Sequence, residues 1–396
     1  MSTVRQGGSV APAPAGDQLT HSHSSPALSG TLTTRMPWLD GLRALAVAAV
    51  LAFHSGATRA SGGSVGVDVF FVLSGFLITM LLLREHRSSG RLHLGRFYAR
   101  RALRLWPALV VLLLGCLLYA ALAKHPVGTR DMSSTFPGAL FYVSDFQAAA
   151  GHLPLFGLTE HTWSLSIEEH FYLLWPLVLG IMLARGVRLR VLLGVTAGLT
   201  IISAVLPPLF WSGGGSVDRI YYAPDTRAQS LLVGCLLGLI VGAGAMPTSP
   251  RAQRWIRVAG VAGGVGLIAY VIWGSWLDSW NYHGGLTLVA LAAVAVVAAT
   301  ITAPLGPAAK VLAFAPLVAL GRISYGIYLW HWPVFVVLNG AYLGLPWIPT
   351  LVIRITVTLA LATASWWLVE RWFLRLRHRF DPPGRVRSPA GAVPPV

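Results

Sequence analysis

One apolar stretch carries two ionisable residues at a spacing that suits chemistry. Arg43 and His54 are eleven residues apart, which on a helix is three turns plus about 20°, so both share one face. The same spacing separates them by about 16 Å along the axis, with Asp40 one turn before Arg43 and able to pair with it. Taken singly, Arg43 could extend to a membrane interface and His54 could be a packing residue. Together they favour a polar path through a helical bundle.

Asp68 lies in the next apolar stretch and could assist His54. It belongs to the segment Gly66–Phe76 and is expected at a depth similar to that of His54. A carboxylate beside an imidazole fixes its tautomer and raises its basicity, as a general base requires. The alternative is that Asp68 only accepts hydrogen bonds from free amides at a helix N-terminus. The sequence therefore predicts a His54–Asp68 pair and leaves that alternative open.

The segment that begins near residue 161 places Trp163 before two adjacent carboxylates, Glu168 and Glu169. Both acids lie at the edge of an apolar helix, and one of them should face the interior of the bundle. The alternative is a capping pattern, in which a preceding serine and these acids only satisfy free amides. We expect Glu168 to act with His54, and Glu169 and Trp163 to position a substrate.

A later segment has Ser324, Tyr328 and His331 on one helical stripe. Pro333 would loosen the helix close to His331. Aromatic residues here could be only an interfacial belt, but the histidine among them favours a role in positioning substrate.

The basic segment 96–107 contains Arg101 and Arg104, which are three residues apart and can face the same way. Guanidinium groups suit phosphate groups because they donate two parallel hydrogen bonds. Topology alone could explain the charge, but the segment is denser in arginine than topology needs. The segment therefore favours an anionic ligand on the cytoplasmic side of the membrane.

The elements that must position these residues are membrane helices. Hydrophobic residues make up 55% and charged residues 11% of the 396 residues, whereas soluble domains have about 25% charged residues. The chain is predicted to be an all-α, polytopic membrane bundle with about ten spans. The apolar stretches are 38–56, 65–83, 106–123, 164–184, 191–210, 228–245, 258–277, 285–303, 323–340 and 350–369.

The net charge of +16 follows membrane topology rather than nucleic-acid binding, because the arginines cluster between apolar stretches. Most of the 30 Lys and Arg residues fall on one side of the membrane if the N-terminus is cytoplasmic. This asymmetry predicts a multi-pass protein of the plasma membrane with both termini in the cytoplasm.

The two ends and the cysteines have no expected catalytic role. Residues 1–35 and 381–396 have the composition of disordered cytoplasmic tails, which leaves 36–380 as one transmembrane domain. Cys116 and Cys235 lie in apolar stretches and are expected to be small buried residues without a disulfide. No cluster of ligands with metal-binding spacing occurs, so no metal is expected.

Taken together, these motifs resemble the acyltransferase 3 family of membrane O-acyltransferases. They occur in the order of that family, over about 36–375. One residue departs from the pattern: His170 follows the two glutamates where the family commonly has Gln, which leaves the acceptor site open in detail. We expect no soluble esterase-like domain of the kind fused to some members. The matching segments are Leu39–Ala44 with His54, Gly66–Phe76, Phe97–Arg104, Trp163–Glu169, Ser324–His331 and Val369–Arg371.

The resemblance implies transfer of an acyl group, often acetyl, from acyl-CoA to a hydroxyl of a glycan or glycosylated small molecule. It implies that Arg43 and His54 are the paired motif of the first span and that Arg101 and Arg104 meet the CoA donor. His54 would then deprotonate the acceptor or carry the acyl group transiently. Acyl-CoA would be a substrate, and no bound cofactor is expected.

Two other classes of protein were weighed. A secondary transporter or exporter of a polar or lipid-linked sugar would also place ionisable groups at two depths. The absence of an internal repeat and the dense arginine cluster argue against it. A scaffolding membrane protein would not need buried Arg, His, Asp and Glu.

Overall fold

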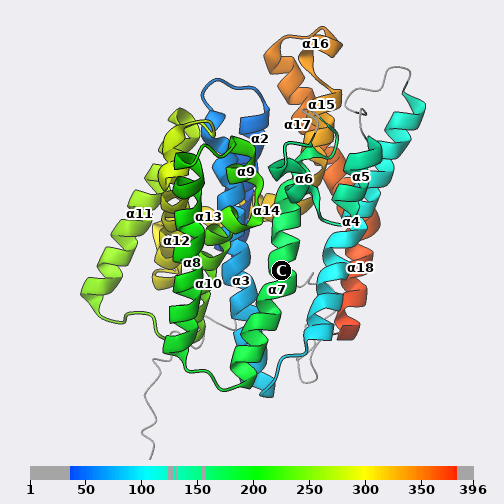
Figure 1. The fold of residues 1–396 in the computed structure, drawn as a ribbon. Helices are drawn as coiled ribbons and strands as arrows, with labels where there is room; N and C mark the ends of the chain where they lie inside the picture. The colour runs from blue at the N-terminus through cyan, green and yellow to red at the C-terminus, as the bar shows by residue number, and fades with distance from the viewer. Residues whose placement is uncertain (1–35, 124–128, 130–131, 154–156, 381–396) are drawn as a thin grey trace, which may run out of the picture. The chain divides into compact units, whose positions relative to one another are not determined.

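The computed structural model describes residues 36–123, 129, 132–153 and 157–380, which belong to one compact unit. Within these residues every regular element is helical and no strand occurs, which confirms the all-α prediction (Figure 1). The predicted tails, 1–35 and 381–396, lie outside the described residues. The longer helices are α2 (Pro37–His54), α3 (Val65–Ser89), α4 (Leu94–Leu122), α7 (Trp163–Ala184), α8 (Leu189–Ser212), α10 (Pro224–Gly242), α11 (Pro250–Trp273), α12 (Gly285–Thr302), α15 (Ser324–Val337) and α17 (Trp347–Ser365). The shorter elements are η1 (Ser61–Ser64), α5 (Met132–Leu140), α6 (Ser144–Ala149), η2 (Glu160–Thr162), α9 (Val217–Tyr222), η3 (Ser279–His283), α13 (Pro307–Leu312), α14 (Ala315–Arg322), α16 (Gly340–Leu343), η4 (Trp366–Glu370), α18 (Arg371–Leu376) and η5 (Arg377–Phe380).

Eight helical segments of the described chain are long and apolar enough to cross a membrane, which confirms a polytopic membrane protein. The other two predicted spans correspond to α2, which includes Asp40 and Arg43, and to α15, which has only 14 residues and follows a break at Ile323. These two less apolar helices carry five of the predicted site residues: Arg43 and His54 in α2, and Ser324, Tyr328 and His331 in α15. The eight segments are Ser61–Ser89, Leu94–Leu122, Glu160–Ala184, Leu189–Ser212, Val217–Gly242, Pro250–Trp273, Gly285–Thr302 and Trp347–Leu376.

Helices α3 and α10 pack closely in the interior of the bundle. Glycines permit this approach, since a Cβ on Gly75 would lie 1.9 Å from the carbonyl oxygen of Leu231. Likewise, a Cβ on Gly234 would lie 2.1 Å from the carbonyl oxygen of Val72. Small residues at a helix interface let two backbones touch, which is how membrane helices gain packing energy without a hydrophobic effect between them.

Helix α2 packs against α13 and α14 through close backbone contacts at glycines as well. A Cβ on Gly41 would meet the Leu312 carbonyl oxygen at 1.8 Å, and a Cβ on Gly321 would meet the Asp40 carbonyl oxygen at 1.8 Å. Because α15 follows α14 after a single residue, this contact also sets α2 alongside α15.

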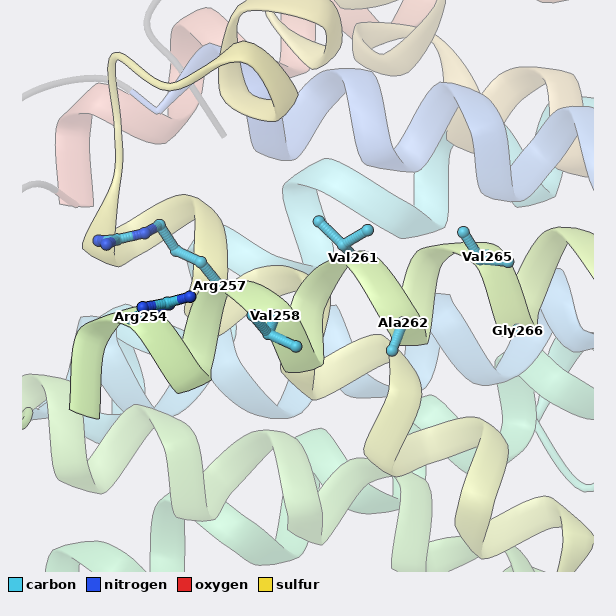
Figure 2. Close-up of a pocket in the computed structure, with 7 residues that line it drawn as sticks. All are labelled: Arg254, Arg257, Val258, Val261, Ala262, Val265 and Gly266. Atoms are coloured by element: carbon cyan, nitrogen blue, oxygen red, sulfur yellow. The ribbon is translucent and has the colours of Figure 1, made fainter. Parts of the chain in front are cut away.

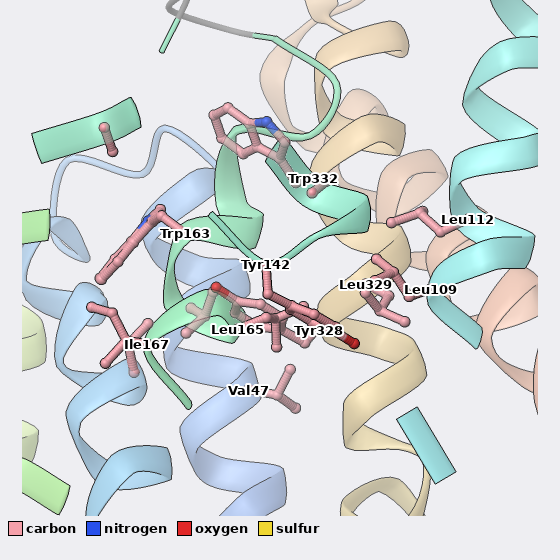
Figure 3. Close-up of a cluster of buried hydrophobic side chains, with 14 of the residues drawn as sticks. Val47, Leu109, Leu112, Tyr142, Trp163, Leu165, Ile167, Tyr328, Leu329 and Trp332 are labelled. Atoms are coloured by element: carbon pink, nitrogen blue, oxygen red, sulfur yellow. The ribbon is translucent and has the colours of Figure 1, made fainter. Parts of the chain in front are cut away.

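The short elements α5, α6 and α9 lie at the end of the bundle where α7 begins (Figure 1). Beneath them is a cluster of buried apolar side chains drawn from α2, α4, α7 and α15, and Tyr142 lies among them (Figure 3). By contrast, α11 is largely exposed along its length, with Val261 and Ile268 more than 60% exposed, as a lipid-facing helix would be.

Candidate functional site

Arg43 and His54 of α2 both face α15, as their spacing predicts. Arg43 Nε donates a hydrogen bond to Ser324 Oγ at 3.2 Å. His54 Nδ1 lies 3.0 Å from His331 Nε2. Since Ser324 and His331 belong to one helix, the two α2 residues line the same interface at two depths.

The hydrogen bonds of His331 determine the tautomer of His54. His331 Nδ1 lies 2.5 Å from the carbonyl oxygen of Tyr328, and a carbonyl can only accept, so Nδ1 carries the proton. In a neutral imidazole the other nitrogen then accepts, so His54 Nδ1 must donate to His331 Nε2. This leaves a lone pair on His54 Nε2. No described residue hydrogen-bonds to that atom, and His54 is half-buried, so Nε2 is equipped to take a proton.

Aromatic rings hold the His54 imidazole in place. Its ring centre lies 4.6 Å from that of Trp332, edge to face, and 4.8 Å from that of Phe53. Trp332 is itself fixed, because its Nε1 donates to the Gly157 carbonyl oxygen at 2.7 Å. The imidazole is therefore oriented by packing as well as by His331.

The predicted His54–Asp68 pair was wrong. Asp68 instead forms a buried ion pair with Arg227 of α10, with Arg227 Nη2 3.0 Å from Asp68 Oδ1. Ser230 Oγ donates to the same oxygen at 2.9 Å. Arg227 lies just outside the predicted span 228–245, but its side chain is only 1% exposed. A guanidinium at that depth is a stronger partner for the carboxylate than a neutral imidazole.

Aromatic residues surround the Asp68–Arg227 pair. The Arg227 guanidinium lies 4.8 Å from the ring centre of Tyr221 and 5.8 Å from that of Trp163. Trp163 also packs against the ring of Tyr222. The structure thus places Trp163, a predicted positioning residue, beside the ion pair, and its role in binding substrate stays a prediction.

A further set of interacting polar residues, which we call the polar core, consists of Arg43, Ser74, Arg101, Glu168, Glu169 and Tyr172. Ser74 Oγ donates to Glu168 Oε1 at 2.8 Å, and Tyr172 OH donates to Ser74 Oγ at 2.7 Å. The Arg101 guanidinium lies over the Tyr172 ring, 3.2 Å from its centre. Both arginines are close enough to Glu168 to interact electrostatically with it. Glu168 therefore faces the interior, as predicted for one of the two acids, and Glu169 lies near Arg101 as well.

Arg101 and Arg104 do not occupy equivalent surroundings. Arg101 points into the polar core, whereas Arg104 is an electrostatic neighbour of Glu370. Glu370 ends a π-helical turn, Trp366–Glu370, and accepts a hydrogen bond from Ser365 Oγ at 3.0 Å. Such π-helical turns often occur at functional sites. The sequence analysis quoted the segment 369–371 as part of the family pattern but assigned no role to Glu370.

Sequence reasoning missed His161. It is 3% exposed, and its ring centre lies 5.5 Å from those of both Tyr328 and His331. Tyr328 OH donates to the His161 carbonyl oxygen at 3.0 Å and lies 2.5 Å from Ser164 Oγ. His54, His161 and His331 thus form a histidine cluster. The sequence could have indicated His161, because it lies two residues before the predicted site residue Trp163. Within the described residues no group of three His, Cys, Asp or Glu side chains has the arrangement of a metal site.

His170, which departs from the family pattern, does not join the histidine cluster. Its Nδ1 lies 3.1 Å from Asp145 Oδ2, and its ring lies against that of Phe146. It therefore links α7 to α6 rather than to the residues around His54.

A groove of about 680 Å³ runs along α11 (Figure 2). It is lined by Arg254, Arg257, Val258, Val261, Ala262, Val265 and Gly266. None of these residues belongs to the polar core or to the histidine cluster, and α11 is mostly exposed. The groove is therefore separate from the candidate site.

The motifs that build this site are matched by a known sequence family. The profile of a family described as an acyltransferase domain matches residues 36–369. The chain belongs to the acyltransferase 3 family. It is 35% identical over 346 residues to the peptidoglycan O-acetyltransferase OatA of Listeria monocytogenes, covering 85% of this chain and 55% of that protein.

Two further relatives agree with this assignment. The O-acetyltransferase OatA of Staphylococcus aureus (strain NCTC 8325 / PS 47) is 34% identical over 343 residues, or 85% of this chain and 56% of the relative. The putative peptidoglycan O-acetyltransferase YrhL of Bacillus subtilis is 33% identical over 354 residues, or 85% and 54%. The chain thus spans about half the length of these relatives. No solved structure matches the chain significantly. The family match and the apolar helices together make this chain a membrane member of the acyltransferase 3 family.

Proposed function

We propose that this protein transfers an acetyl group from cytoplasmic acetyl-CoA to a hydroxyl of a cell-wall glycan. The observation that carries the proposal is the unpartnered Nε2 of His54, held in one tautomer by His331 beside the polar core. The names of the relatives support peptidoglycan as the acceptor class. The family assignment favours an enzyme over the transporter considered above.

The donor would enter from the end of the bundle that carries most of the arginines. There α3 and α4 contribute Arg84, Arg96 and Arg100, and the adjacent turn of α4 contributes Arg104. Phosphates of CoA suit this cationic end. The pantetheine arm would then pass Arg101 and Arg43, towards the histidine cluster. Arg101 acts inside the bundle in this scheme, and Arg104 lies closer to Glu370.

The chemical step follows from the His54 tautomer. His54 Nε2 removes the proton of the acceptor hydroxyl as its oxygen attacks the thioester carbonyl carbon. The carbon–sulfur bond then breaks, and the CoA thiolate takes the proton from His54 Nε2. His331 keeps the His54 imidazole in the required tautomer throughout.

The orientation is part of the proposal. With the arginine-rich end facing the cytoplasm, both termini are cytoplasmic and His54 lies towards the outer face of the plasma membrane. An acceptor that lies outside the cell would meet His54 there, while the donor arrives from the opposite side. Polar residues at two depths are then needed because donor and acceptor come from different compartments.

Transfer by purified protein in sealed vesicles tests this function. We expect label from [acetyl-¹⁴C]acetyl-CoA to appear on solubilised peptidoglycan, and Arg101→Ala to raise the KM for acetyl-CoA about tenfold or more. Arg257→Ala is the matched control, because Arg257 lies on exposed α11. A cysteine introduced at Gly186 should be labelled by a membrane-impermeant maleimide only on the side where acetyl-CoA supports transfer. No transfer by the wild-type protein to any glycan would refute the function, and an unchanged KM in Arg101→Ala would refute the donor path.

A further inference from the structure

Helix α11 packs against the bundle with one face and leaves another face open. A Cβ on Gly260 would lie 2.2 Å from Ala299 Cβ, and a Cβ on Gly263 would lie 2.7 Å from the Ala292 carbonyl oxygen, so these glycines face α12. All the residues that line the groove of Figure 2 are exposed and lie on the open face. The groove therefore opens towards the lipid that surrounds a membrane bundle.

The groove is basic at one end and apolar along the rest of its length. Its lining residues form two rows with a spacing of four along α11, so each row follows one side of the helix. The rows are Arg254, Val258, Ala262 and Gly266, and Arg257, Val261 and Val265. Figure 2 shows both arginines at one end and the valines further along. A Cβ on Gly266 would meet no atom of the described residues within 4 Å, so the apolar end is hollow.

Two exposed tryptophans indicate which membrane levels α11 reaches. Trp255 and Trp273 lie near the two ends of the helix, 18 residues apart. That is about 27 Å along a helix, close to the roughly 30 Å of the hydrocarbon layer. Exposed tryptophans gather where this layer meets the headgroups, so Arg254 and Arg257, which flank Trp255, lie at headgroup level. The apolar part of the groove, residues 258–266, extends about 12 Å and fits within one leaflet of about 15 Å.

The two arginines of the groove have no partner among the described residues. Neither Arg254 nor Arg257 forms a hydrogen bond, an ion pair or a ring contact there. By contrast, Arg219 donates two hydrogen bonds to the Asp225 carboxylate. Helix α11 has no Asp or Glu, so a second copy packed through the same face would not supply an anion. Two guanidinium groups on one face of a helix suit a phosphate group.

We propose that this groove binds one anionic phospholipid. The phosphate lies between Arg254 and Arg257, and an acyl chain runs along Val261 and Val265 into the hollow at Gly266. A headgroup with net negative charge is preferred to a zwitterionic one, because a choline group would bring a cation next to the arginines. The apolar length of the groove fits a lipid of one leaflet rather than a chain that crosses the membrane.

The lipid site lies away from the proposed reaction. Ser61 Oγ donates to the Gly274 carbonyl oxygen at 2.7 Å, at the C-terminal end of α11. Ser61 belongs to η1, which follows the His54 end of α2, so Arg254 and Arg257 lie towards the opposite end of the bundle. The inference therefore does not depend on the proposed function, and Arg257→Ala is still expected to leave the KM for acetyl-CoA unchanged.

Lipid binding by the full chain tests the inference. Purified protein in detergent is titrated with phosphatidylglycerol and with phosphatidylcholine of the same acyl chains, and native mass spectrometry gives the Kd of the first lipid bound. We expect a Kd about tenfold lower for phosphatidylglycerol. Arg254→Ala combined with Arg257→Ala should raise that Kd about 10- to 30-fold and remove the preference. Gly266→Leu should raise the Kd of both lipids about fourfold, because the new side chain takes the place of the acyl chain.

Arg251→Ala and Gly194→Leu are the matched controls. Arg251 is exposed at the same end of α11 but does not line the groove. Gly194 is an exposed glycine of α8, where a Cβ would also meet no atom of the described residues within 4 Å. Both controls should keep the wild-type Kd, and without added lipid every variant should unfold at or above the wild-type temperature.

Three results would overturn the inference. The first is an equal Kd for the two lipids in the wild-type protein. The second is an equal loss of phosphatidylglycerol binding in Arg251→Ala, which would indicate attraction to positive charge without a site. The third is a dimer in place of the lipid adduct, lost in Gly266→Leu, which would assign the groove to a second copy of the chain.

Discussion

Two buried polar groups of this protein differ in how the ionisable acid or base at their centre is paired. In the Asp68–Arg227 group, both carboxylate oxygens have partners, from Arg227 and Ser230, and aromatic rings cover the guanidinium, whose Nε and Nη1 have no hydrogen-bond partner among the described residues. No described residue hydrogen-bonds to His54 Nε2, and in the polar core Arg101 Nε is buried without a hydrogen-bond partner among the described residues.

This difference in hydrogen bonding distinguishes a carboxylate that holds the fold together from an imidazole that is free to react. A buried ion pair whose carboxylate oxygens are all used joins two helices, here α3 and α10, and its carboxylate has no lone pair left to act as a base. A buried group with a free lone pair or a free N–H or O–H can take part in a reaction. Asp68 and His54 have similar depth and both are ionisable, so only their partners reveal which of them does which task.

The largest effect is expected at His54. His54→Ala removes the proposed base and should lower the rate of acetyl transfer about 10²- to 10⁴-fold, with the protein still folded. The measurement is transfer from labelled acetyl-CoA, alongside thermal unfolding and elution from a sizing column. A folded variant with full activity would show that His54 is not the base.

The next effect concerns stability rather than activity. Asp68→Ala leaves the Arg227 charge buried and unpaired, which should destabilise the protein by about 3–5 kcal/mol. The folded fraction should keep its transfer activity. Asp68→Ala combined with Arg227→Met should recover stability, because no unpaired charge remains. If Asp68→Ala stays stable but loses transfer, Asp68 belongs to the reaction after all, and the comparison fails.

A smaller effect is expected at His331. His331→Phe removes the acceptor for the His54 Nδ1 proton, so the imidazole can change tautomer, and transfer should slow about tenfold. His331→Gln should restore part of the rate, because its amide oxygen can accept the same proton. Equal rates in both variants would mean that His331 only packs against His54.

Part of the site could be predicted because it follows from the period of one helix. The eleven-residue spacing of Arg43 and His54 requires a shared face, and the structure confirms it through Ser324 and His331. The placement of Glu168 in the interior likewise follows from its position in an apolar helix. The roles of these residues, and of Arg104, Glu169 and Trp163, stay predictions.

The predictions that failed have one cause in common. The spacing of residues within one helix does not show which side chains from distant parts of the chain will contact each other. Asp68 and Arg227 are 159 residues apart. Arg227 lies directly before the predicted span 228–245, and nothing in its local pattern indicates that it pairs with Asp68.

The sequence by itself determined that this protein is a bundle of membrane helices with the motifs of a membrane acyltransferase, because apolar length, helical period and motif order are properties of the chain alone. Only the tertiary structure decided which polar groups satisfy one another. Inside a membrane protein each buried charge must find a partner from another helix, and helix packing through residues such as Gly75 and Gly321 sets which one it meets.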